Sequence, residues 1–323
     1  HFHLKNNNTT KYTTIFTMLQ EHGYVTFKVY DSVSDIRELI QTECKQFPEY
    51  VHPVELYVLG GFSGFGNPSS FHNPAVRKVR YDVYQKSKMV LSEVYPDRNI
   101  EVLYDRLMVR KSGCVPSKES WHRDITPNID IKDVIFGGWI NLDDRSNYFS
   151  CIPCSHLEKQ DGPNGFAKIS KTSAEYSTLN KRKQKIEVKP GYCILFFQNI
   201  LHEVLSQKLS YDSYRVFNSI RITDSKEPLY NKLKIMELQA VPPLPSFQIP
   251  PMYAKLHWTN WLEKIKSFSN MVVPICRESR ERKSDKSIHT VVQQHMKSLK
   301  EYNMSLYLEY TEEETKIYLP HPL

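Results

Sequence analysis

The chain has 323 residues, of which 40% are hydrophobic and 24% charged. This composition supports a large core and excludes a disordered protein, and 11 glycines are too few for collagen. The net charge of +7 is a mild excess. Two short basic clusters, 181–185 and 277–286, are typical of solvated loops and leave a nucleic-acid partner open without predicting one. No apolar run approaches the roughly 18 residues of a membrane span, so we expect a soluble, cytoplasmic protein.

The first predicted elements are two helices with a strand between them. A helix is expected over 12–20 and a strand over 24–30, and Asp31 or Ser32 is positioned to cap the second helix. Three apolar residues of that second helix fall on one face: Ile36, Leu39 and Ile40.

The middle of the chain alternates between apolar and polar residues, as β-strands do. Before it, residues 53–75 are rich in Gly, Pro, Ser and Asn, which predicts a long loop or lid, and a helix is expected over 75–94. Short strands without βαβ alternation favour an antiparallel sandwich or barrel with flanking helices over a Rossmann fold. The predicted strands are 102–110, 138–142, 185–189, 192–197 and 214–222.

A proline-rich stretch at 241–251 marks the expected end of the β-rich domain. We therefore predict one domain over 1–240 and a mainly helical extension over 241–323. Helices with one apolar face are expected over 258–268 and 288–302, packed on the core or on a protein partner. His295 lies on such a face and is expected to be a packed core residue.

A metal-binding pattern links the middle of the chain to its later strands. Two histidines and one carboxylate bind Fe(II) on one triangular face and leave the opposite positions open. Residues i and i+2 of a strand point the same way, so His122 and Asp124 offer two ligands from one segment. Among the 12 histidines only His122 begins a His-x-Asp triplet. His202 follows a Pro-Gly turn and an apolar strand, and is positioned to supply the third ligand from a distant strand.

An arginine follows on the next predicted strand. The planar guanidinium of Arg215 suits a dicarboxylate, which it binds through two parallel hydrogen bonds. Together with the metal pattern it indicates iron, 2-oxoglutarate and oxygen. Arg221 shares the same strand face and is the alternative for this role. Arg106 and Arg110, on the strand before the metal segment, either help to bind a carboxylate or face solvent.

Three further segments make the resemblance specific. Residues 19–25 (Leu-Gln-Glu-His-Gly-Tyr-Val), 138–144 (Gly-Trp-Ile-Asn-Leu-Asp-Asp) and 152–156 (Ile-Pro-Cys-Ser-His) resemble motifs of the phytanoyl-CoA dioxygenase-like family. These Fe(II)/2-oxoglutarate oxygenases fold as a double-stranded β-helix, the cupin-like jelly roll. The resemblance implies that the iron ligands are His122, Asp124 and His202. It also implies that Arg215 binds 2-oxoglutarate and that Trp139 forms a wall of that pocket.

Two positions depart from the family's pattern. Cys154 stands where the family's turn has glycine, and Val204 replaces a hydroxyl that some members offer to 2-oxoglutarate. A rival His-x-Glu, His156 and Glu158, lies where the family has a turn, so we expect a structural role for it. Only Cys151 and Cys154 form a CxxC pair, without a second pair for a zinc site, which favours reduced thiols.

The expected reaction is the oxidation of an organic substrate with Fe(II), 2-oxoglutarate and O2, giving succinate and CO2, with ascorbate as a candidate reductant. Hydroxylation is favoured because Asp124 occupies the ligand position that iron halogenases leave vacant for chloride. A small metabolite, an acyl thioester, a peptide side chain and a nucleobase are all compatible substrates. The alternative is a catalytically inactive jelly-roll scaffold that uses its C-terminal helices as a binding surface.

Overall fold

The computed structural model describes residues 17–45, 71–113, 119–124, 132–158, 169–205, 207–226, 254–255 and 309–318. Most of the predicted 53–75 loop, the two C-terminal helices and His295 lie outside this part of the chain. Within it, no helix combines the length and the hydropathy that crossing a membrane requires.

Two antiparallel sheets form the core. The larger sheet has the strand order β1-β7-β4-β9-β2 and the smaller one β3-β8-β5-β6. The strands are β1 (Tyr24–Lys28), β2 (Asn99–Arg110), β3 (Glu119–His122), β4 (Val134–Asn141), β5 (Asn147–Cys151), β6 (Gln184–Val188), β7 (Tyr192–Phe197), β8 (His202–Val204) and β9 (Ser213–Thr223).

The strand pairing is nested from the outside inward. Strand β2 pairs with β9, β3 with β8, β4 with β7, and β5 with β6. The chain therefore behaves as one long hairpin that is rolled up, so that successive pairs fall alternately in the larger and the smaller sheet. This is the arrangement of a jelly roll, and it confirms the predicted fold class. Strand β1 adds a further edge to the larger sheet by pairing with β7.

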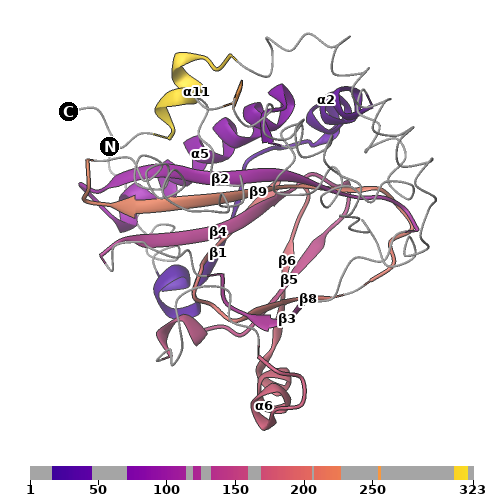
Figure 1. Cartoon of the computed structure of the whole chain (residues 1–323), viewed down its shortest axis with the longest axis vertical. Coiled ribbons are helices and arrows are strands. Elements are labelled where there is room, and N and C mark those ends of the chain that lie inside the picture. Colours follow the sequence, from indigo (N-terminus) through magenta and orange to yellow (C-terminus); the bar gives the residue numbers. More distant parts are fainter. Residues whose placement is uncertain are drawn as a thin grey trace, which may run out of the picture.

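Two helices cover the outer face of the larger sheet (Figure 1). They are α2 (Ser34–Cys44) and α5 (Pro74–Val94), and α5 agrees with the predicted 75–94 helix. Asn73 caps α5 by accepting a hydrogen bond from the Ala75 N–H at 2.9 Å, with Pro74 at the first helical position. The even-numbered residues of β9 pack beneath these helices: Tyr214, Val216, Ile220 and Ile222.

Three details of the first predicted helices differ in the structure. The N-cap of α2 is Val33, which makes no side-chain cap, so neither Asp31 nor Ser32 caps the helix. Leu39 is 40% exposed, and the buried face of α2 consists of Ile36, Ile40 and Cys44. Of the helix predicted over 12–20, the described part is the single π-helical turn η1 (Met18–His22), which ends later than expected.

The outer face of the smaller sheet has its own cover. Helix α6 (Ala174–Arg182) lies beneath this sheet in Figure 1, and Leu179 on it packs with the buried Trp121 of β3. The basic cluster 181–185 spans the end of α6 and the start of β6, and several of its residues are exposed.

The described C-terminal residues, 309–318, pack against α5 and β2. They include the short helix α11 (Glu312–Lys316), which lies beside α5 in Figure 1. Arg77 of α5 forms a 2.9 Å ion pair with Glu314, and the Val102 N–H donates to the Ile317 carbonyl at 2.7 Å. This segment thus belongs to the core packing, while the division into 1–240 and 241–323 stays a prediction.

Two glycines with positive φ allow a prediction about backbone strain. Gly23 has φ +85° and an added Cβ would lie 2.4 Å from Nδ1 of His156, whereas Gly113 has φ +83° with nothing described within 4 Å. Gly113→Ala should cost about 1–2 kcal/mol of unfolding free energy, because only the left-handed conformation opposes it. Gly23→Ala should cost more, because His156 must also move. Urea denaturation measures both, and His156→Ala should remove the difference. If Gly23→Ala and Gly113→Ala lower the free energy of unfolding equally when His156 is present, a contact with His156 does not add to the strain at Gly23.

Candidate metal centre and carboxylate pocket

The two predicted histidine ligands face each other across neighbouring strands. His122 is the last residue of β3 and His202 the first of β8, and they are direct partners in the antiparallel register. Their ring centroids are 4.2 Å apart, and both residues are buried. The pairing of β3 with β8 therefore brings together two residues that are distant in sequence.

Backbone carbonyls hold both rings by the same nitrogen. Nδ1 of His122 lies 2.7 Å from the Ser120 carbonyl oxygen, and Nδ1 of His202 lies 3.2 Å from that of Ile200. A carbonyl only accepts, so each Nδ1 carries the proton and donates. Each Nε2 is then the nitrogen that would coordinate an ion, an arrangement that is usual for metal-bound histidine.

Asp124 completes a triangle with the two imidazoles. Its Oδ1 lies 3.5 Å from Nε2 of His122 and its Oδ2 3.3 Å from Nε2 of His202. One potential ligand atom from each of the three residues lies within 4.8 Å of the others. Asp124 sits two residues past the end of β3 rather than on a strand, so the expected strand alternation is not what directs it.

Asp124 and His202 each stabilise the charged form of the other. Partial burial alone would raise the pKa of Asp124, but the His202 and His122 rings and the Arg106 guanidinium lower it below its usual value. Burial alone would lower the pKa of His202, but the Asp124 carboxylate outweighs it and raises that pKa. A proton and a metal ion would therefore compete for Nε2 of His202.

Aromatic side chains and a second carboxylate surround the triangle. The rings of Phe149 and Phe196 lie 5.5 and 5.1 Å from that of His202. They form an apolar wall on the inner side of the two sheets. Oε2 of Glu119 lies 3.7 Å from Nε2 of His122. The sequence reasoning missed Glu119, which precedes His122 by three residues and so lies outside the His-x-Asp pattern.

Arg215 lies on the inner face of the larger sheet, with Trp139 beneath its guanidinium group. The guanidinium carbon is 4.3 Å from the centroid of the Trp139 ring, and one Nη donates to Oδ1 of Asn147 at 2.8 Å. Trp139 packs in one cluster with Phe149 and Phe196, which connects it to the histidines. Burial, followed by repulsion from the neighbouring Arg110, lowers the pKa of Arg215 to about 9.

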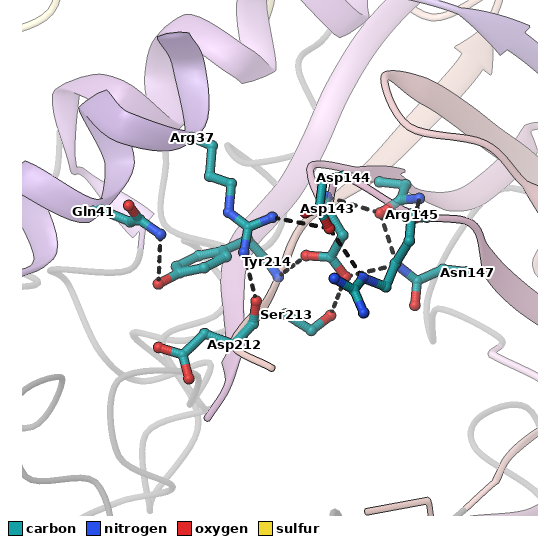
Figure 2. A network of polar contacts seen from close by, with 10 residues as sticks. Arg37, Gln41, Asp143, Asp144, Arg145, Asn147, Asp212, Ser213 and Tyr214 are labelled. Atoms are coloured by element: carbon teal, nitrogen blue, oxygen red, sulfur yellow. Dashed lines mark hydrogen bonds and ion pairs between the residues drawn. The ribbon is translucent and has the colours of Figure 1, made fainter. Parts of the chain in front are cut away.

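A buried network holds the partner of Arg215 in place (Figure 2). The Asn147 amide donates to Oδ1 of Asn141 at 2.7 Å and to Oδ2 of Asp143 at 2.8 Å. Because the NH2 end of Asn147 is committed to these acceptors, its oxygen must face Arg215. Asp143 in turn accepts from the Ser213 hydroxyl at 2.6 Å and the Tyr214 N–H at 2.7 Å.

Arg221, the alternative to Arg215, is already satisfied by protein carboxylates. It is fully buried and donates to Glu101 at 2.5 Å and to Asp133 at 2.7 Å. It lies six residues from Arg215 on β9, a separation of about 20 Å along a strand. This ion triad is therefore a structural element at the far end of the sheet, away from Arg215.

The inner face also includes the two arginines that could have faced solvent. Arg106 is opposite Phe217 in the β2–β9 register, and its guanidinium carbon is 4.6 Å from the Phe217 ring centroid. Arg110 is opposite Ser213, on the same face. These residues of β2 are partly exposed while Leu107 and Val109, on the opposite face, are buried. The inner side of β2 is therefore less completely covered than its outer side.

The other candidate residues lie apart from the triangle. The His156 ring stacks on Phe197 with centroids 4.9 Å apart, and its Nε2 lies 3.0 Å from the Gln20 carbonyl oxygen. Glu158 forms an exposed ion pair with Arg182. These contacts favour the structural role expected for His156 and Glu158. Cys154 is exposed and has φ +67°, the left-handed conformation that glycine adopts readily.

Comparisons with known proteins give distant structural likenesses. No family model and no curated protein sequence matches the chain. It is similar to iron-bound EctD from S. alaskensis (15% identity, TM-score 0.45, covering 68% of this chain and 79% of EctD). It is also similar to SnoN, a non-heme alpha-ketoglutarate-dependent epimerase from nogalamycin biosynthesis (10% identity, TM-score 0.42, covering 66% of this chain and 81% of SnoN). A third similar structure is AviO1 from Streptomyces viridochromogenes (11% identity, TM-score 0.43, covering 67% of this chain and 96% of AviO1). The chemistry of the site therefore rests on the residues themselves.

The triangle predicts how a divalent ion binds. Asp124→Ala should weaken Mn²⁺ binding by more than the ten- to hundredfold that loss of an outer-shell partner costs, because a charged ligand is removed. Glu119→Gln is the matched control, since it removes the other carboxylate near His122 and should change the affinity less than about tenfold. Calorimetric titration of the metal-free protein measures both. A larger loss in Glu119→Gln than in Asp124→Ala would place the carboxylate ligand at 119.

Proposed function

We propose that this chain is an Fe(II)- and 2-oxoglutarate-dependent oxygenase. The observation that carries the proposal is the convergence of His122, Asp124 and His202 on one point of the inner face of the jelly roll. The two-histidine, one-carboxylate set is typical of non-heme Fe(II) oxygenases. Membership of the phytanoyl-CoA dioxygenase-like family remains a narrower proposal, supported by the motifs at 19–25, 138–144 and 152–156.

The residues present fit such an ion. Two nitrogens and one carboxylate oxygen lie within 4.8 Å of one another, and the carbonyls of Ser120 and Ile200 hold the ring tautomers that coordination needs. Bound Fe(II) would supply the activation of O2 that couples decarboxylation of 2-oxoglutarate to oxidation of the substrate. Asp124 contributes the negative charge that retains a dication between two neutral imidazoles.

The chain's own residues then bind and shield the reactants. Arg215 holds the distal carboxylate of 2-oxoglutarate, with its guanidinium orientation set by Asn147 and its flat face resting on Trp139. The fork of an arginine suits this carboxylate better than a lysine would. Phe149 and Phe196 restrict water beside His202, which limits unproductive side reactions.

The reaction that we propose is hydroxylation of an organic substrate, with release of succinate and CO2. Asp124 supports hydroxylation over halogenation because it occupies the position that chloride would need. We propose a small-molecule or acyl substrate that binds on the inner side of β2, where Arg106 and Arg110 are partly exposed. A cytoplasmic location and a protein partner bound through the C-terminal helices remain predictions.

Succinate formation separates an enzyme from an inactive scaffold. With Fe(II), ascorbate and 2-oxoglutarate, the wild type should release succinate slowly even without its substrate, because the co-substrate is consumed in uncoupled turnover. Asp124→Ala should abolish this release while the fold survives, since Asp124 lies outside the core clusters. Chromatography quantifies the succinate, and circular dichroism checks the fold. Equal traces from both proteins would favour the scaffold.

A pair of conservative arginine variants tests the co-substrate pocket. Arg215→Lys should weaken 2-oxoglutarate binding by about tenfold or more, because a point charge replaces a bidentate fork. Arg221→Lys should instead lower the free energy of unfolding, because it disturbs a buried ion triad with Glu101 and Asp133. Binding is measured with Mn²⁺ in place of iron, and stability by urea denaturation. The reverse assignment of effects would show that Arg221 holds the co-substrate.

A further inference from the structure

Arg110 and Arg215 are diagonal neighbours on the inner face of the larger sheet. In the β2–β9 register Met108 is opposite Arg215 and Arg110 is opposite Ser213. Opposite residues of antiparallel strands share a face, and residues displaced by two positions remain within reach of long side chains. The two side chains therefore extend from the same face, and the charge of Arg110 acts on Arg215.

This pair of cations lacks a direct counter-charge among the described residues. The Nε atoms of Arg110 and Arg215 are buried and have no hydrogen-bond partner there. Burial lowers the pKa of both arginines, and Arg110 lowers that of Arg215 further. Two like charges in a buried site are unfavourable until an anion joins them.

Asp143, whose charge acts on both arginines, does not fill this role. Asp143 is fully buried, and its oxygens accept hydrogen bonds from Ser213, Tyr214 and Asn147. It compensates Arg215 only indirectly, through Asn147, and the Nε donors of both arginines have no partner among the described residues. A carboxylate from a ligand would complete the charge balance.

We propose that Arg110 is a second ligand-binding arginine, so that two guanidinium groups share the distal carboxylate of 2-oxoglutarate. This inference rests on the proposed function. Val204 offers no hydroxyl at the position where the resemblance implies one, and Glu119 is its direct partner across β3 and β8. The charge of Glu119 acts on Arg110. Arg110 therefore extends toward β3, the strand that also carries His122.

The test compares two ligands that differ in one carboxylate. The Mn²⁺-loaded protein is titrated with 2-oxoglutarate and with 2-oxobutanoate, which keeps the oxo acid but has no distal carboxylate. Arg110→Met should weaken 2-oxoglutarate binding by about ten- to hundredfold and leave 2-oxobutanoate binding within about twofold. Arg145→Gln is the control for net charge, since Arg145 is half exposed and pairs with Asp144, and it should change neither affinity.

The stability of the ligand-free protein gives an independent readout. Removing Arg110 relieves its repulsion from Arg215, so Arg110→Met should keep or raise the midpoint of thermal unfolding. A merely structural arginine would lower it. If Arg110→Met does not fold, Arg110→Lys replaces it and should lose three- to tenfold in 2-oxoglutarate affinity alone.

The outcomes separate this inference from the proposed function. A wild type that binds no 2-oxoglutarate overturns both. A wild type that binds it, with an unchanged affinity in the Arg110 variants, overturns the role of Arg110 and leaves the oxygenase proposal standing. Equal weakening of both ligands also overturns that role, because Arg110 would then shape the pocket without contacting the distal carboxylate.

Discussion

The pairing of β3 with β8 is the constraint on which the candidate site depends. Both strands are short, and their register places His122 opposite His202. In the nested order this pair lies between β2–β9 and β4–β7, which bring the flanking stretches of chain together in the larger sheet. The histidine pair is thus a consequence of the nested topology.

The two faces of the larger sheet have different roles: the outer face packs against helices, and the inner face carries the residues of the candidate site. The outer face is apolar and covered by α2 and α5. The inner face carries Arg106, Arg110 and Arg215 beside aromatic rings. Because strand residues alternate, each of β2 and β9 contributes to both faces with every second residue. Gly137 serves the inner face differently: without a side chain it lets the Phe196 ring lie close to β4.

Much of this arrangement was predictable from the sequence, and the exceptions have physical reasons. His122, Asp124 and His202 stood out because residue type and local spacing are visible along the chain. Strands β3 and β8 have four and three residues, at or below the shortest run in which alternation can be recognised. The pairing of Arg110 with Arg215 depends on register across two strands, which no local pattern encodes. Leu39 was misplaced because periodicity defines a helix face but not which of its residues a neighbour covers.

The contact between Val102 and Ile317 affects how the molecule behaves toward its own copies. Strand β2 is an edge of the larger sheet, and edge strands present backbone groups to which another chain can add. The Ile317 carbonyl occupies one outward N–H of β2, and Tyr318 is buried beside it. The last described residues therefore shield an edge at which intermolecular strand addition, and with it aggregation, would otherwise begin.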